Sequence, residues 1–397
     1  MRRPSLVLVV ACVVSLGLAF QSVPWSARRR KKELLFVVPL TYAAELATTA
    51  AALVAPGKGL LASDESEETL FARFGASGVE CTQATVRAYR TLLYTTPELS
   101  KFITGVVLAA EAFLEETDEG VAFADVLSGN GAVPGVRIDT GSAVLPGARE
   151  GETFSRGLDG LNERASRFRD CGARFAKWRA RFRISDRDGA PSALAIKENC
   201  WTMARSARTL QELGLVPLLE PAVLLEGDHA VERAAEIQER IYVEVFRALS
   251  ENGVFLEGLI LKPSMTTPGL ASDERVTPEL VAAYSVRTLE RTVPSAVPGI
   301  TFNSGGLSEE EASLCLDAMN RIERKGPWSV TFGFARSLQS SCLNAWAGNP
   351  DNTQAAQAYL VARAKANAAA NLGQYAPGSQ PTLDDTVGLR GWTSAAA

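Results

Sequence analysis

The sequence predicts a single closed (β/α)8 barrel, the TIM-barrel arrangement, and three observations lead to this fold class. Eight short runs rich in Val, Ile, Leu or Phe recur along the chain, as expected for buried parallel strands. Amphipathic segments such as 161–170, 197–213 and 230–252 lie between these runs. The length of 397 residues suits one α/β barrel with extensions. Eightfold alternation of strand and helix therefore favours a barrel.

The eight predicted strands are residues 59–63, 103–109, 134–138, 174–184, 215–219, 255–261, 299–303 and 329–334. A doubly wound open sheet is the alternative fold. It usually carries a glycine-rich phosphate loop after its first strand, whereas Gly57 and Gly59 here come before or at the start of that strand. We expect the barrel to span residues 41–377 and residues 378–397, which are rich in small and polar side chains, to form a mobile tail.

Residues 1–40 have the composition of a targeting leader. They hold seven basic residues and one acidic residue, with an apolar run at 6–18 that is short for a membrane span. The basic stretch 20–32, which has no acidic residue, follows this run. The leader thus resembles the bipartite signal and transit presequences of algae with secondary plastids. We expect a plastid protein, in the chloroplast stroma, with secretion and a membrane anchor through 6–18 as alternatives.

Composition excludes several classes of function. Without the leader the chain holds 34 basic and 44 acidic residues, so we expect no nucleic-acid partner, and no membrane association of the mature form. His229 is the single histidine, so we expect neither a zinc site nor a cofactor, and its polar surroundings predict a solvated side chain. The cysteines outside the leader are scattered and predict small buried residues: Cys81, Cys171, Cys200, Cys315 and Cys342.

Charged and polar side chains mark the ends of seven predicted strands. In a barrel, catalytic groups gather at the carboxyl ends of the strands. The period of two along a strand puts Lys177 and Arg179 on one face, so two cations would share the barrel mouth if that face points inward. The strand-end residues are Asp64, Arg137, Asp139, Lys177, Arg179, Arg181, Arg183, Glu220, Lys262, Ser304, Gly305, Gly306 and Arg336.

Each of these residues also has a structural interpretation. Asp64 could cap a helix, because residues 64–68 read Asp-Glu-Ser-Glu-Glu. Glu220 could be an ion-pair partner, and residues 304–311 could form a turn and a capping box. Their joint placement at strand ends favours a functional site.

Seven stretches, in order, are similar to class I fructose-bisphosphate aldolases, and the chain resembles that family from about residue 43 to 377. The most specific stretch is Leu-Glu-Gly-x-x-Leu-Lys-Pro at 256–263, because its lysine, Lys262, corresponds to the family's Schiff-base residue. The seven stretches are residues 54–66, 157–161, 175–179, 191–196, 256–263, 301–306 and 308–313.

The resemblance implies reversible cleavage of fructose 1,6-bisphosphate into dihydroxyacetone phosphate and glyceraldehyde 3-phosphate, without a metal, in glycolysis or plastid carbon fixation. Lys262 would attack the ketose carbonyl, and burial beside the cation Lys177 would lower its pKa. Glu220 would be the general acid and base, oriented by Lys177, and Asp64 would take the proton of the C4 hydroxyl.

The same resemblance implies two phosphate-binding groups and a homotetramer. The 1-phosphate would be bound by Ser304, Gly305, Gly306 and Arg336. The 6-phosphate end would be bound by Ser66, Thr69, Arg73 and Arg137, with Arg179 nearby.

Several positions depart from the family pattern. Arg137 replaces a lysine, Ala222 an acid, Leu307 a glutamine, and Gly333 and Ala335 replace a serine and a glycine. The family's C-terminal tyrosine is absent, since the last tyrosine is Tyr375. Two further hypotheses therefore stay open: a catalytically weakened aldolase-like scaffold that binds partners, and another Schiff-base barrel enzyme acting on a different sugar phosphate.

Overall fold

The computed structural model describes residues 41–384 and Trp392. The predicted leader, residues 1–40, lies outside the described residues, as do residues 385–391 and 393–397 of the predicted tail. Among the described residues, none of the helices combines the length and the apolar character that a bilayer span requires.

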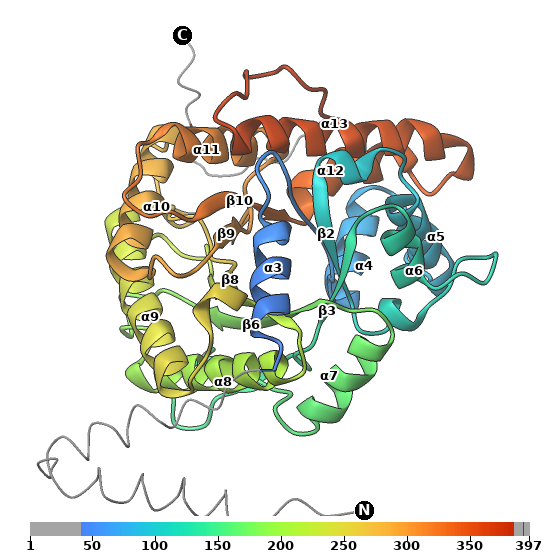
Figure 1. Cartoon of the computed structure of the whole chain (residues 1–397). Helices are drawn as coiled ribbons and strands as arrows, with labels where there is room; N and C mark the ends of the chain where they lie inside the picture. The colour runs from blue at the N-terminus through green and yellow to red at the C-terminus, as the bar shows by residue number, and fades with distance from the viewer. Residues whose placement is uncertain (1–40, 385–391, 393–397) are drawn as a thin grey trace, which may run out of the picture. The chain divides into compact units, whose positions relative to one another are not determined.

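Eight parallel strands close into a barrel in the order β1-β10-β9-β8-β7-β6-β3-β2, which confirms the predicted fold class and excludes the open sheet (Figure 1). The strands are β1 (Gly59–Ser63), β2 (Ile103–Leu108), β3 (Val133–Arg137), β6 (Phe175–Phe182), β7 (Val216–Val223), β8 (Ile260–Leu261), β9 (Gly299–Phe302) and β10 (Ser329–Phe334). All eight coincide with predicted runs, but β8 has only two residues, because Leu256–Gly258 before it form a 3-10 turn.

Helices follow the strands and surround the barrel (Figure 1). They are α4 (Glu67–Ala76), α5 (Gln83–Tyr94), α6 (Phe123–Gly129), α7 (Leu161–Asp170), α8 (Ala193–Glu212), α9 (Val231–Glu251), α10 (Pro278–Thr292), α11 (Glu309–Arg321) and α12 (Arg336–Trp346). The hairpin β4 (Ser142–Val144) and β5 (Thr153–Ser155) precedes α7. Local sequence determines where α11 begins: Ser308 Oγ accepts from Glu311 N, and Glu311 accepts from Ser308 N, as the predicted capping box requires.

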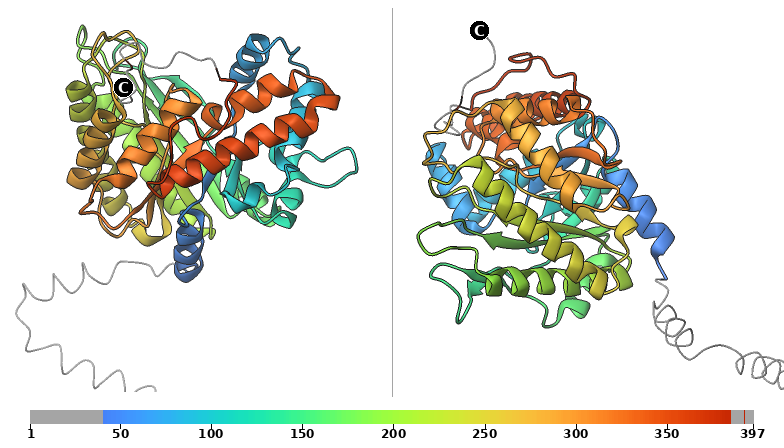
Figure 2. Two further views of the ribbon diagram at one scale, coloured as in Figure 1. Left: turned by 90° about the horizontal axis from the view of Figure 1, so that it is seen from above. Right: turned by 90° about the vertical axis from the view of Figure 1, so that its left-hand side faces the viewer.

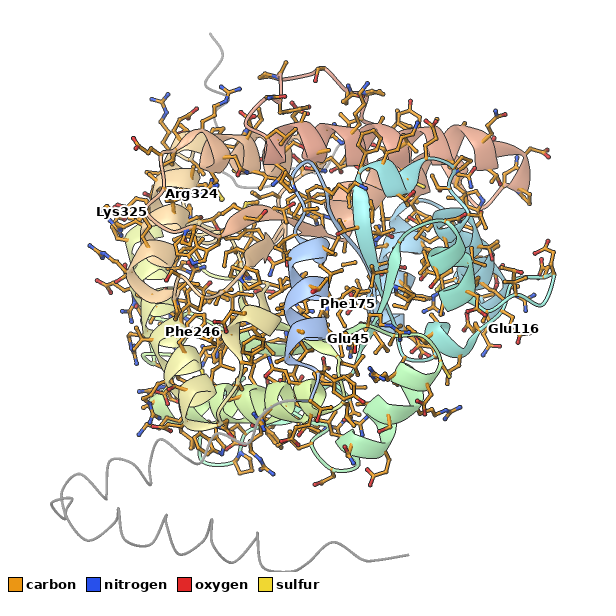
Figure 3. The ribbon with its side chains drawn as sticks, viewed as in Figure 1. Glu45, Glu116, Phe175, Phe246, Arg324 and Lys325 are labelled. Atoms are coloured by element: carbon orange, nitrogen blue, oxygen red, sulfur yellow. The ribbon has the colours of Figure 1, made fainter. Side chains whose placement is uncertain are left out.

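The amino end of the barrel is filled by apolar side chains. The aromatic ring of Phe175, at the start of β6, lies so close to Gly135 that a Cβ there would approach it to 2.2 Å (Figure 3). Helix α3 (Ala43–Leu53) covers this end, with Leu53 against Gly105 (Figure 1). Side chains larger than glycine at residues 105 and 135 would displace this packing.

Helix α13 (Thr353–Asn371) packs against α11 and α12 (Figure 2). The chain then returns over α11, where the buried carboxylate of Glu309 accepts hydrogen bonds from Ser341 Oγ at 2.5 Å and Thr382 Oγ1 at 2.8 Å. Asp384 Oδ2 accepts from Glu309 N at 2.8 Å. The mobile tail expected from residue 378 therefore has a hydrogen-bonded beginning over residues 378–384, because the buried acid of α11 binds it.

Two burial predictions were wrong. His229 is only 6% exposed, because backbone hydrogen bonds from residues 269–271 to the carbonyls of Leu225, Gly227 and His229 hold a second loop across it. Cys171, directly after the last residue of α7, is exposed and Cys81 is only half-buried, whereas Cys200, Cys315 and Cys342 are buried as predicted.

Candidate active site

A cavity of about 740 Å³ opens at the carboxyl ends of the strands. Thirteen site residues were predicted from the sequence, and the structure brings all of them to its lining: Asp64, Ser66, Thr69, Arg73, Arg137, Lys177, Arg179, Glu220, Lys262, Ser304, Gly305, Gly306 and Arg336.

Four charged residues form the centre of the cavity, and each comes from a different strand or from the residue directly after one. Lys177 Nζ, on β6, lies 2.5 Å from Asp64 Oδ2 and 3.0 Å from Glu220 Oε2. Lys262 Nζ, directly after β8, donates to the same Glu220 oxygen at 3.0 Å. All four side chains are between 3% and 6% exposed, so each charge depends on the others for compensation.

The two lysines have opposite pKa shifts. Burial lowers the pKa of Lys262, Lys177 lowers it further, and the carboxylate of Glu220 only partly opposes these effects. Burial also disfavours the charge of Lys177, but Asp64 and Glu220 outweigh it and raise that pKa. Lys262 is therefore the lysine that loses its proton more easily, and a neutral amine is what nucleophilic attack on a carbonyl requires.

Glu220 is the acid shared by these cations. Burial would raise its pKa, but Lys177, Lys262 and Arg179 together hold it well below the ordinary value. Arg179 Nε lies 3.1 Å from Glu220 Oε1, the oxygen that the lysines do not contact. Glu220 is therefore ionised when the site is empty of substrate, with a hydrogen-bonded path to Lys262.

One group of rim residues lies where β9 and β10 end. Gly305 and Gly306 have φ values of +54° and +104°, so the turn after Ser304 uses the left-handed region that glycine allows. Arg336 Nη2 donates to Leu307 O at 3.1 Å and also to Gly306 O, and this ties the turn to the start of α12. The turn and a guanidinium therefore face one part of the cavity.

A second group lies between β1 and β3. Ser66 also has a structural role, because its Oγ caps α4 by accepting from Thr69 N at 3.3 Å. Asp64, for which a capping role was the alternative, is instead paired with Lys177. Arg73 is paired with Glu65, and Arg137 Nη1 donates to Asp64 O at 3.3 Å.

Asp139 was one of the strand-end residues, without an assigned role, and the structure shows that it supports the site. Its carboxylate is paired with Arg137 at 3.3 Å and accepts from Gly141 N at 3.1 Å and Arg179 N at 3.3 Å. It therefore positions two of the rim arginines. Its spacing of two residues from Arg137 was the available signal, since alternate residues share a face.

A family model for class I fructose-bisphosphate aldolase matches residues 45–387. The chain belongs to the class I fructose-bisphosphate aldolase family. Fructose-bisphosphate aldolase 2, chloroplastic, of Arabidopsis thaliana is 44% identical over 367 residues, which cover 92% of this chain and 91% of that protein. The cytoplasmic isozyme of Spinacia oleracea is 46% identical, over 85% of this chain and 94% of that protein.

A solved aldolase has the same fold. The structure of fructose-bisphosphate aldolase from Plasmodium falciparum, in complex with TRAP and a small-molecule inhibitor, superimposes with a TM-score of 0.83 at 43% identity. The match covers 86% of this chain and 97% of that one. The predicted enzyme class, a fructose-bisphosphate aldolase, is thereby confirmed.

Two of the departures from the aldolase pattern lie at the cavity, and one of them, Gly333, lies beside Lys262. A Cβ at Gly333 would lie 3.1 Å from Lys262 Cε and 3.4 Å from Thr301 Oγ1. That Thr301 hydroxyl is buried, and among the described residues it has no hydrogen-bond partner. Ala222 lines the cavity two residues after Glu220, at a position where an acid would face the barrel mouth.

Proposed function

We propose that Lys262, Glu220, Asp64 and Lys177 carry out the reversible aldol cleavage of fructose 1,6-bisphosphate through a Schiff base on Lys262. The class of reaction follows from membership of the aldolase family. The single observation that carries the residue roles is the contact of Lys262 Nζ with Glu220 Oε2 at 3.0 Å, between a lysine of lowered pKa and an ionised acid.

Formation of the Schiff base needs one proton to move between these two residues. Lys262 attacks C2 of the open-chain ketose as a neutral amine; the nitrogen gives one proton to Glu220, and the C2 oxygen takes one proton from solvent, so that a neutral carbinolamine forms. Glu220 then gives its proton to the C2 hydroxyl, which leaves as water while the carbon–nitrogen double bond of the iminium ion forms. Lys177 holds Glu220 in place through the contact at 3.0 Å.

Cleavage follows from the iminium ion. Asp64 takes the proton of the C4 hydroxyl, the C3–C4 bond breaks, and its electron pair moves to C3 as the iminium becomes an enamine. Glyceraldehyde 3-phosphate then leaves, and protonation of C3 and hydrolysis release dihydroxyacetone phosphate. Asp64 Oδ2 lies 2.5 Å from Lys177 Nζ, and this contact fixes the position of the base at the barrel mouth.

The two rim groups fit the two phosphates of this substrate. We propose that Ser304, Gly305, Gly306 and Arg336 bind the 1-phosphate, through backbone N–H groups and a guanidinium. The 6-phosphate lies against the cations and hydroxyls of the other group: Ser66, Thr69, Arg73, Arg137 and Arg179.

We also propose a homotetramer in the plastid, where carbon fixation would run the reaction toward condensation. Support comes from the composition of residues 1–40 and from similarity to chloroplastic aldolases. Light scattering of the mature protein tests the tetramer, and sequencing of its N-terminus identifies the cleavage site. Secretion would be indicated if the basic stretch 20–32 were retained in a protein recovered outside the cell.

Borohydride trapping tests the chemistry. Incubation with dihydroxyacetone phosphate and borohydride should give one adduct, on Lys262, and none in Lys262→Met. Lys325→Met is the matched control, because Lys325 is an exposed lysine of the outer surface (Figure 3), and it should keep both the adduct and the turnover. A chelator should leave turnover unchanged. A folded protein with neither adduct nor turnover would favour the scaffold hypothesis.

A further inference from the structure

Strand β6 carries a row of three cations toward the barrel mouth; the inner two are paired with acids, and the outermost has no ion pair among the described residues. Lys177, Arg179 and Arg181 alternate along β6 and therefore share its inner face. The register with β7 pairs Arg179 with Glu220 and Arg181 with Ala222. The methyl group of Ala222 offers Arg181 no charge and no hydrogen-bond acceptor.

The contacts agree with this register. Arg179 is bound to Glu220 at 3.1 Å. The side chain of Arg181 is exposed and makes neither a hydrogen bond nor an ion pair within the part of the chain that the structure describes. It nevertheless lines the active-site cavity.

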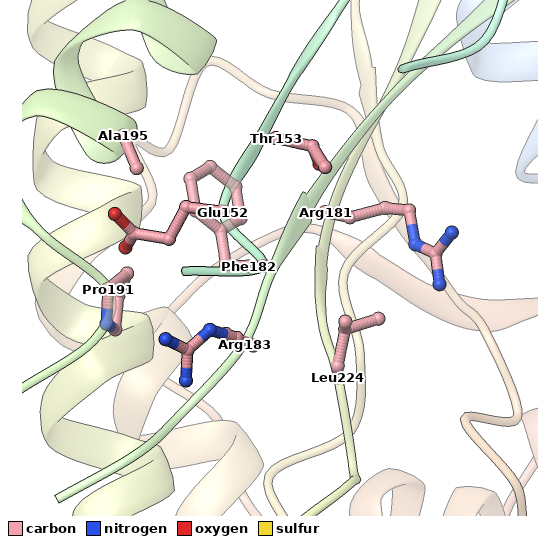
Figure 4. Close-up of a pocket in the computed structure, with 9 residues that line it drawn as sticks. Glu152, Thr153, Arg181, Phe182, Arg183, Pro191, Ala195 and Leu224 are labelled. Carbon is pink, nitrogen blue, oxygen red and sulfur yellow. The ribbon is translucent and has the colours of Figure 1, made fainter. Parts of the chain in front are cut away.

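A second, smaller cavity beside the mouth shows the direction in which Arg181 points. The guanidinium of Arg181 points away from the carboxylate of Glu152 and from Arg183, which lie on the other side of this cavity (Figure 4). Glu152 is already occupied, since it accepts from Ser192 N and Ser192 Oγ, each at 2.6 Å. Arg183 is paired with Asp188. Glu152 and Asp188 are therefore engaged with other partners.

Arg179, unlike Arg181, has an acid opposite it, because the register places Glu220 there. Glu220 serves Lys177, Lys262 and Arg179 together, so part of the charge of Arg179 is neutralised inside the site. Arg181 stands about 6.6 Å further out along the strand. An unpaired guanidinium is well suited to a phosphate, because its planar donors match two phosphate oxygens.

We propose that Arg181 is a specificity-determining residue that binds the phosphate at the aldehyde end of the sugar. This inference rests on the proposed function, because that function places such a phosphate in this cavity. It deepens the function by adding a residue of this chain that would distinguish ketoses with a second phosphate, at the chain end far from the carbonyl, from ketose 1-phosphates.

Calorimetry in a Lys262→Met background tests the proposal, because that protein binds the sugar without forming the Schiff base. Arg181→Ala should weaken the binding of fructose 1,6-bisphosphate about tenfold, as expected for one charged hydrogen-bonded contact. It should change the Kd of fructose 1-phosphate less than about twofold. Arg181→Lys should recover part of the loss, since the charge remains.

Two further variants distinguish the effect of Arg181 on binding from a general effect of positive charge. Ala222→Glu places an acid opposite Arg181 and should weaken binding of the bisphosphate without removing the arginine. Arg187→Ala removes one exposed positive charge outside the cavity lining and should leave both Kd values unchanged. Equal losses for the two sugars, or equal behaviour of Arg181→Ala and Arg187→Ala, would overturn the proposal.

The two proposals fail separately. Absence of a borohydride adduct on Lys262 would overturn the proposed function. The ratio of the two Kd values tests the role of Arg181 whether or not the adduct forms, because both values are measured in the Lys262→Met background, where no turnover is needed.

Discussion

Lys177 Nζ lies 2.5 Å from Asp64 Oδ2, although β6 and β1 are not neighbours in the barrel. The contact crosses the barrel mouth and joins the proposed base to the lysine that also holds Glu220. The four central charges therefore form one electrostatic unit, and substitutions in it should separate the steps of the reaction.

Asp64→Asn should lower the rate of cleavage about 10²- to 10⁴-fold, because the base for the C4 hydroxyl is lost. The adduct of dihydroxyacetone phosphate on Lys262 should still form, since that step uses Glu220. Steady-state turnover and mass spectrometry after borohydride measure the two steps. Asp118→Asn, at an exposed ion pair with Arg87, is the control. Loss of the adduct together with turnover would contradict the assigned role.

Glu220→Gln should lower the pKa of Lys262, because the carboxylate of Glu220 favours the protonated lysine. The pH at which an amine-specific reagent modifies half of Lys262 should therefore fall. Turnover should fall about 100-fold, since the carbinolamine loses its acid. A rise of the modification midpoint, in a protein whose melting curve remains cooperative, would refute this reading of the charges.

Gly333→Ser should tighten binding of the ketose phosphate. Its Cβ would lie 3.4 Å from Thr301 Oγ1, and its hydroxyl could supply the partner that this buried oxygen lacks among the described residues. We expect KM for fructose 1-phosphate to fall about threefold, within the energy of one neutral hydrogen bond. Gly333→Ala adds the Cβ without the hydroxyl and should not reproduce the gain. An equal change in both variants would assign the effect to packing.

His229→Phe should reduce the loss of stability on acidification. Burial lowers the pKa of His229, the cation Arg233 lowers it too, and Asp186 and Asp228 oppose them. As pH falls below about 6.5 the unfolded chain binds the proton first, so the folded state loses stability until pH reaches the lowered pKa. Between pH 7.5 and 5.5 the melting temperature of the variant should fall by a few degrees less than that of the parent. Equal slopes would exclude His229 as the cause.

Glu309→Ala should destabilise the protein by about 3–5 kcal/mol, because it removes one of the two acids that lie 3.6 Å from the fully buried Arg363 and leaves Ser341 Oγ without its carboxylate acceptor. The melting temperature should fall by on the order of 10 °C. Limited proteolysis should then cut within residues 378–384, because Thr382 Oγ1 in this segment no longer has Glu309 as its hydrogen-bond acceptor. Glu212→Ala, at an exposed ion pair on α8, should change the melting temperature by about 1 °C or less. Resistance of 378–384 to the protease would show that other contacts hold this segment.

The sequence by itself determined the barrel and the membership of its site. A buried strand is a local apolar run, and a polar residue directly after it, such as Lys262 after β8, lies at the carboxyl end whatever the rest of the chain does. The period of two likewise assigned Lys177 and Arg179 to one face before any partner was known. These features depend on neighbours within a few residues.

Only the tertiary structure decided which charges meet and which residues are covered. Closure of the barrel brings Lys177 to Asp64, and the β6–β7 register gives Arg179 an acid but leaves Arg181 opposite Ala222. A loop some forty residues further along the chain buries His229, although the sequence around His229 is polar. Such contacts join distant parts of the chain, so they follow from packing and register, which no local pattern specifies.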